Sequence, residues 1–117
     1  MARTRNEVLR IARELHVRLA ALYGDRLKGV YLYGSYARGE ATDDSDIDVA
    51  VVLEGPVHAH SEEERASDLV GDLCLRENCL LVPFFLSEEE YRRTPYAVHR
   101  SIAQEGAPVW NLSARKG

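Results

Sequence analysis

The sequence predicts an α/β fold of the α+β kind, in which helices pack on a small sheet. Apolar residues recur at helical spacing near the start of the chain, and short β-branched and aromatic runs follow. The run Ile47–Leu53 is almost entirely apolar, as expected for an inner strand covered on both faces. No repeat or low-complexity segment interrupts the order, so we expect a single domain over residues 1–117 with a polar tail at 113–117.

The elements of the N-terminal half follow from spacing and from glycine. Apolar residues predict a helix that ends near Tyr23, with Gly24 as its C-terminal cap. A β-branched and aromatic run then predicts a strand that stops at Gly34. The expected elements are a helix over 8–22, a strand over 30–33, a short helix over 36–39 ended by Gly39, and a strand over 47–53.

The C-terminal half is read in the same way. Ser61 and Glu64 fit a capping box, which predicts that a helix begins near residue 62. Pro83 interrupts the next apolar run and predicts an edge strand or a bulge. The expected elements are a helix over 62–75, a strand over 79–86, a helix capped by Ser87, a helix over 95–104 followed by Gly106, and a short strand over 107–110.

Composition narrows the possible functions. The formal net charge of -4 gives no reason to expect direct nucleic-acid binding, which needs a basic face. Cys74 and Cys79 are too few for a disulfide framework or a zinc site, and we expect reduced, buried or half-buried thiols. No signal peptide or bilayer-spanning run is recognisable. These features predict a soluble, cytoplasmic protein.

The main candidate for chemistry is a pair of carboxylates at the start of the second strand. Residues i and i+2 of a strand point the same way, so Asp46 and Asp48 are expected on one face and Ile47 in the core. Two carboxylates this close repel each other unless a cation lies between them. Magnesium suits them, because it prefers oxygen ligands and commonly combines one or two carboxylates with substrate phosphates.

The second candidate is the Gly34–Ser35 pair at the end of the first strand. Gly34 lets a phosphate approach the backbone, and the Ser35 hydroxyl with the N–H groups of the next turn can bind anionic oxygens. Two interpretations of Arg38 stay open with equal weight. It either places positive charge near the phosphates or pairs with a carboxylate of the loop that follows, at Glu40, Asp43 or Asp44.

Other polar and aromatic groups are assigned structural roles. The exposed pair His58 and His60 is expected to be solvated and not to bind metal, and the acidic run 62–64 to favour a helix start. Tyr31 and Tyr33 share a strand face with Ser35. They could line a nucleotide pocket, but packing under a helix is favoured.

These residues resemble the signature of the minimal nucleotidyltransferase (MNT) family, within the DNA polymerase β-like nucleotidyltransferase superfamily. The family pattern is Gly-Ser, ten residues, then Asp-x-Asp. Gly34–Ser35 and the acids at 46 and 48 fit it, and Ala37, Arg38, Gly39 and Ser45 match common choices. Length and element order also suit the family, so the resemblance extends over the whole domain.

The resemblance implies a mixed sheet flanked by helices and a specific division of roles. Asp46 and Asp48 would bind Mg²⁺ and serve catalysis, while Gly34, Ser35, Arg38 and Ser45 would bind the nucleotide. AMP would pass from ATP to a hydroxyl. The family's third carboxylate, on a later strand, has no counterpart in residues 79–86, where Pro83 or a neighbour takes its place.

The resemblance also implies a partner. Members of this family are typically paired with a small helical HEPN protein as antitoxin and toxin, in a hetero-oligomer. The acceptor would then be a tyrosine of the HEPN toxin, whose RNA cleavage the added nucleotide blocks. Two alternatives remain: a catalytically weak or inactive module that neutralises HEPN by binding, and a small-molecule transferase similar to the aminoglycoside nucleotidyltransferases.

Overall fold

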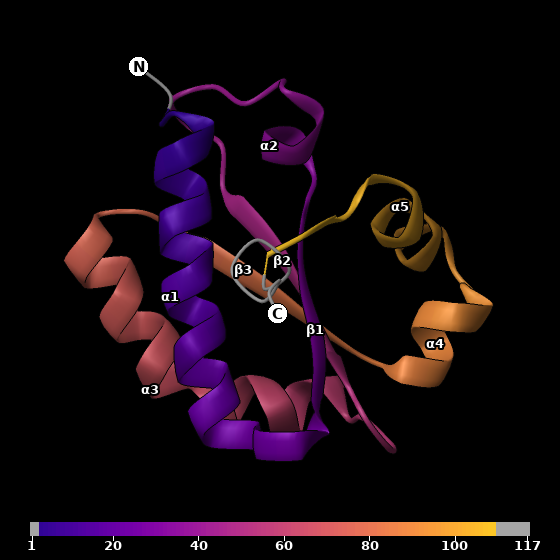
Figure 1. The fold of residues 1–117 in the computed structure, drawn as a ribbon. Helices are drawn as coiled ribbons and strands as arrows, with labels where there is room; N and C mark the ends of the chain where they lie inside the picture. The colour runs from indigo at the N-terminus through magenta and orange to yellow at the C-terminus, as the bar shows by residue number, and fades with distance from the viewer. Residues whose placement is uncertain (1–2, 110–117) are drawn as a thin grey trace, which may run out of the picture.

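The computed structural model describes residues 3–109 and forms a mixed four-stranded sheet with helices on both faces (Figure 1). The strand order is β3-β2-β1-β4. β2 runs antiparallel to β1 and parallel to β3, while β4 is antiparallel to β1. The elements are α1 (Arg5–Tyr23), η1 (Gly24–Arg26), β1 (Leu27–Tyr33), α2 (Ser35–Arg38), β2 (Ile47–Leu53), α3 (Ala59–Glu77), β3 (Leu81–Ser87), α4 (Glu88–Arg93), α5 (Ala97–Glu105) and β4 (Ala107–Pro108). The predicted fold class is confirmed.

Two apolar layers hold the helices against the sheet. α1 and α3 pack on one face, over buried residues such as Leu32, Val49 and Val51. α4 and α5 lie against the other face (Figure 1), where Ala50, Leu86 and other buried side chains meet Ile102 of α5. Burial on both faces explains why β2 is almost wholly apolar. Only the start of β2 carries carboxylates.

The end of α1 agrees with the expected glycine cap, whereas its N-terminal cap was not expected. α1 ends at Tyr23, and Gly24 follows with a φ of 58°. Thr4 and Glu7 form a capping box at its start that was not foreseen from the sequence. α4 begins at Glu88, with Ser87 as its predicted N-cap.

The expected capping box at Ser61 and Glu64 is wrong, because α3 already begins at Ala59 with His58 as N-cap. The structure around Glu62, the residue after Ser61, explains the difference. Glu62 is 5% exposed, and its carboxylate accepts a hydrogen bond of 2.8 Å from the hydroxyl of Tyr23 in α1. The N–H of Glu62 also donates to the carbonyl of His58 at 3.1 Å, so the first turn of α3 has already closed at Glu62 and Ser61 lies inside it. The acidic run at 62–64 is thus split, since Glu63 and Glu64 are exposed.

The strands confirm the prediction for Pro83. β3 is an edge strand, and Pro83 lies within it. A proline cannot donate to a ladder, so an edge is where it is tolerated. β1 begins at Leu27, three residues earlier than the strand expected from 30. Trp110 and the tail at 113–117 lie outside the described residues. Among the helices of residues 3–109, none is long and apolar enough to cross a membrane.

Candidate active site

The two acids lie where β2 begins. Asp48 is the second residue of the strand and Asp46 comes just before it. Ile47, between them, is 1% exposed and belongs to the core beneath α1 and α3. Asp46 is exposed and Asp48 half-buried. Alternation along the strand thus presents the two carboxylates on the face opposite to Ile47.

The antiparallel register brings the Gly-Ser turn to these acids. Tyr33, the last residue of β1, pairs with Asp48, so the chain leaves β1 beside the carboxylates. Gly34 has a φ of 77°. A Cβ at Gly34 would lie 2.3 Å from Oδ2 of Asp48, which is closer than any side chain tolerates. A glycine is therefore required for contact between the turn and the acid as well as for its backbone conformation.

Ser35 opens the short helix α2 directly after this contact. α2 ends at Arg38, and Gly39 follows in the left-handed conformation with a φ of 77°. The first N–H groups of a helix have no acceptor within the helix. Asp48 and the beginning of α2 therefore border the same space, one supplying negative charge and the other supplying hydrogen-bond donors.

Electrostatics at the acids favour a cation. Burial and the neighbouring charge of Asp46 raise the pKa of Asp48, while the positive charge of Arg38 lowers it. The pKa of Tyr33 rises to about 12, through burial and the charge of Asp48. These side chains thus interact as one cluster. Two oxygen-rich groups that repel each other, beside the Gly34–Ser35 turn, are a donor set that fits Mg²⁺ together with oxygens from a substrate.

Arg38 has two carboxylate partners. Its Nε donates to Glu40 at 2.8 Å and its Nη1 to Glu105 of α5 at 3.1 Å. Pairing with Glu40 is one of the two interpretations left open from the sequence. The partner Glu105 was missed, because no local signal links residues so far apart in the chain. A role for Arg38 with phosphate remains a prediction and requires exchange of these partners.

Ser45 forms its hydrogen bonds within the loop that precedes β2. Its hydroxyl accepts a hydrogen bond of 2.8 Å from the N–H of Thr42, and its own N–H donates to the carbonyl of Thr42 at 3.1 Å. Ser45 thus shapes the turn that delivers Asp46. Its expected contact with nucleotide stays a prediction.

A nucleotidyltransferase domain model matches residues 8–103 of this chain. The chain belongs to the nucleotidyltransferase domain family. It is 34% identical over 93 residues to "Putative protein adenylyltransferase MJ0604" of Methanocaldococcus jannaschii, covering 79% of this chain and 87% of that protein. This agrees with the family expected from the Gly-Ser and Asp-x-Asp pattern and makes the chain a transferase by relationship.

Solved structures show the same fold. A crystal structure described as a putative nucleotidyltransferase from Sulfolobus solfataricus aligns with a TM-score of 0.66 and 23% identity, covering 89% of this chain and 80% of that one. A second match is a complex of a tri-AMPylated Shewanella oneidensis HEPN toxin with an MNT antitoxin. It has a TM-score of 0.53 and 18% identity, with 87% of this chain and 71% of that one covered.

On β3 the residue next to Asp48 is Val82, so no carboxylate of this strand lies beside the two acids. The parallel register places Val82 beside Asp48, whereas Pro83 pairs with Val49. Val82, a neighbour of Pro83, is thus the residue beside the acids, and the replacement of the family's third carboxylate at Pro83 or a neighbour stays a prediction. Within residues 3–109, no group of three or more His, Cys, Asp or Glu side chains is arranged to hold a metal ion. Metal binding by the nucleotidyltransferase would need oxygens from the substrate.

The two strand tyrosines behave differently. Tyr31 stacks on Tyr91 of α4 with ring centroids 5.1 Å apart, which confirms packing under a helix. Tyr33 is half-buried and adjoins Asp48, so it forms part of the wall next to the acids. His58 and His60 are exposed, as expected for a solvated pair, and His60 lies 3.4 Å from Glu64 on the surface of α3.

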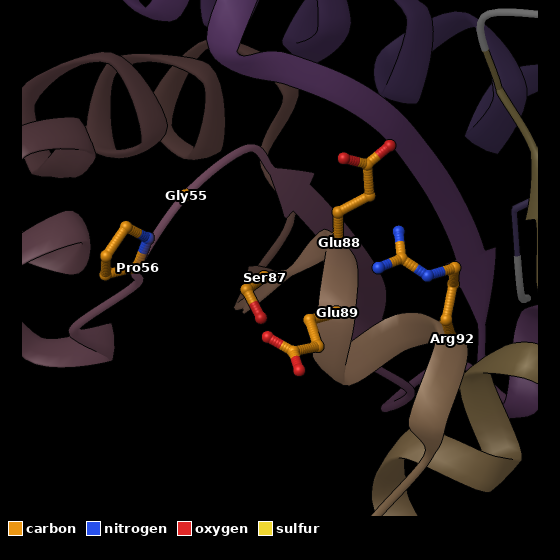
Figure 2. A pocket seen from close by; sticks show the side chains of 6 residues that line it. All are labelled: Gly55, Pro56, Ser87, Glu88, Glu89 and Arg92. Atoms are coloured by element: carbon orange, nitrogen blue, oxygen red, sulfur yellow. The ribbon is translucent and has the colours of Figure 1, made fainter.

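Two hollows lie at opposite ends of β2. One of about 380 Å³ lies between Gly55–Pro56, after β2, and the start of α4, and Figure 2 shows Glu88 and Arg92 beside it. It is at the far end of the strand from the acids. The other, of about 460 Å³, is lined by Asp46 together with Leu75 and Leu80. Of the two site acids of the nucleotidyltransferase, Asp46 lines the second hollow and Asp48 does not.

Proposed function

We propose that this protein is a Mg²⁺-dependent adenylyltransferase that moves AMP from ATP to a protein hydroxyl. The observation that carries the proposal is the contact of Gly34 with Asp48, where a Cβ would lie 2.3 Å from the carboxylate oxygen. This closeness supports the proposal, because it brings the turn expected to bind phosphate next to the acids expected to bind metal. Relationship to a protein of 34% identity described as an adenylyltransferase supports the choice of AMP.

Each residue of the site has a defined task. The N–H groups at the start of α2 and the Ser35 hydroxyl would hold the β- and γ-phosphates. Arg38 would exchange a carboxylate partner for a phosphate oxygen. Asp46 and Asp48 would hold the metal, which when bound supplies positive charge to the α-phosphate and the leaving pyrophosphate. Ser45 would keep the loop in the turn that presents Asp46.

The reaction is an in-line displacement at the α-phosphorus. The acceptor oxygen forms a bond to phosphorus, the bond to pyrophosphate breaks, and the hydroxyl proton must leave. Val82 cannot take that proton, and β3 carries no carboxylate. The proton would pass to water or to a base on the acceptor protein.

We further propose that the acceptor is a tyrosine of a HEPN-family partner and that the protein acts as its antitoxin in the cytoplasm. The supporting observation is the shared fold with a chain of a complex between an MNT antitoxin and a tri-AMPylated HEPN toxin. A nucleotide on an active-site tyrosine would add bulk and negative charge, which opposes RNA binding.

A second function is favoured by Val82. A site with only two carboxylates has less charge to hold a metal, so the protein could neutralise its partner through binding alone. In that case the fold and the partner persist without transfer.

The test uses the purified protein encoded by the gene next to that of this chain, as the proposed HEPN-family acceptor. Transfer of label to it from [α-³²P]ATP is measured in the presence of Mg²⁺. We expect labelled protein from the wild type and none from Asp46→Asn or Asp48→Asn, with complex formation retained. Asp68→Asn, an exposed carboxylate on α3, is the matched control and should label normally. A stable complex without label in the wild type would overturn the transferase proposal and leave the binding function.

A further inference from the structure

The strand order gives the two acids different neighbours on their two flanks. β2 lies between β1 and β3, so Gly34–Ser35 lies on one flank of Asp46 and Asp48, and β3 lies on the other. Val82 is the neighbour of Asp48 on β3. The N–H of Ile47 donates to the carbonyl of Leu80 at 2.9 Å, which places Leu80 beside Asp46.

The flank on the β3 side is apolar and exposed. Leu80 is 56% and Val82 36% exposed, and Leu75, near the end of α3, is 86% exposed. We call these three residues the apolar apron. Leu75 and Leu80 line the hollow of about 460 Å³ to which Asp46 also belongs. Exposed aliphatic side chains gathered beside a reactive site indicate a surface for a partner.

The rim of this hollow is negatively charged. Asp43, Asp44 and Asp46 line it. Arg3, also on the rim, donates to the carbonyls of Glu77 and Asn78 at the end of α3 and keeps its positive charge, so the carboxylates of the rim outnumber its one guanidinium. The whole chain has a formal net charge of -4. Charge complementarity therefore favours a partner with basic side chains around an apolar contact.

We propose that the apolar apron is the docking surface of the protein acceptor, which presents apolar side chains flanked by Lys or Arg. This proposal rests on the proposed transferase function. If the triphosphate lies on the Gly34–Ser35 flank, the acceptor hydroxyl must approach the α-phosphate from the open β3 flank. A partner held there meets Leu80 and Val82 on the way to the acids.

The acceptor docks through side chains and not by adding a strand to the sheet. The N–H of Leu81 donates to Sγ of Cys74 at 3.3 Å, so it is already engaged. Pro83, two residues later on the same edge, has no N–H to offer. This edge of β3 therefore lacks the row of free donors that strand addition requires.

The experiment uses the double variant Leu75→Ser/Leu80→Ser, with Val17→Ser as its control. Val17 is 61% exposed on α1 and does not line the hollow. The probe is the purified product of the neighbouring gene, with [α-³²P]ATP and Mg²⁺. We expect KM for this protein to rise at least about tenfold in the double variant. Both kcat and the affinity for Mg²⁺·AMP-PNP should stay near wild type, and Val17→Ser should leave all three unchanged.

Charge is tested with Asp44→Lys. We expect weaker acceptor binding and a smaller dependence of KM on NaCl concentration than in the wild type, because the rim charge attracts the partner at low salt. An unchanged salt dependence would overturn the assignment of a basic partner.

The outcomes separate this proposal from the function on which it rests. Transfer with an unchanged KM in the double variant overturns the docking surface and leaves the transferase. A wild-type complex without transfer overturns the transferase, and loss of that complex in the double variant still supports the surface. Self-association abolished by the double variant, with acceptor KM unchanged, assigns the apron to a second copy and overturns the proposal. A wild-type protein that neither binds nor labels the probe overturns both the docking surface and the transferase function.

Discussion

Gly34 and Asp48 are in such close contact that a single added carbon at Gly34 would meet the carboxylate oxygen at 2.3 Å. The contact joins the end of β1 to the start of β2 across the antiparallel register. Any change that separates these two residues should disconnect the proposed phosphate binding from the proposed metal binding. The relationship therefore provides the most direct test of the site.

Gly34→Ala should displace Asp48. We expect the affinity for Mg²⁺·AMP-PNP to fall at least about tenfold, or about 1.4 kcal/mol, measured by titration calorimetry. Gly39→Ala is the matched control, because Gly39 also has a φ of 77° but has no atom near the added Cβ. Both variants should lose about 1–3 kcal/mol of stability from backbone strain. Equal nucleotide affinity in the two variants would refute the steric role of Gly34.

Asp46→Asn should stabilise the protein in EDTA while removing its stabilisation by Mg²⁺. The charge of Asp46 raises the pKa of Asp48, so the pair destabilises the folded state when both are ionised. We expect a gain of up to about 1 kcal/mol at pH 7, measured by thermal unfolding.

The sign of the pH dependence follows from linkage. A carboxyl whose pKa is raised by folding holds more protons in the folded than in the unfolded state, so its destabilising effect disappears as the pH falls. The difference between Asp46→Asn and wild type should therefore vanish towards the ordinary pKa of 3.8. A difference that grows on acidification would contradict the repulsion.

Val82→Asp should supply the missing third carboxylate beside Asp48. We expect Mn²⁺ to bind roughly tenfold more tightly, because affinity for hard cations rises with the charge of the ligands. Val98→Asp is the matched control, since Val98 is 37% exposed, close to the 36% of Val82, but lies on α5. Calorimetry that finds equal Mn²⁺ affinity in both variants would show that Val82 is not placed to complete the site.

Glu62→Ala should weaken the packing of α3 on α1. It leaves the buried hydroxyl of Tyr23 without its acceptor and removes the carboxylate that lies 3.6 Å from Arg26 and 3.5 Å from Arg65. We expect a loss of about 1–3 kcal/mol in urea unfolding. Glu63→Ala, on the exposed side of the same turn, should stay within about 0.5 kcal/mol of wild type.

The sequence by itself determined the class of the fold and indicated the residues of the candidate site. The spacing of apolar residues and the positions of glycine and proline are local properties of the chain. They therefore located β2, the end of α1 and the edge position of Pro83. The spacing of Gly34–Ser35 and Asp46–Asp48 is also local, and it was sufficient to indicate the family.

Tertiary structure decided the features that depend on residues distant in the chain. Glu62 is buried where it accepts a hydrogen bond from Tyr23 of another helix, and α3 begins at Ala59, ahead of the expected cap. Glu105 reached Arg38 from α5, and the parallel register assigned Val82 to the place beside Asp48. A pattern along one strand specifies which side chains share a face, but only the pairing of strands specifies which groups meet there.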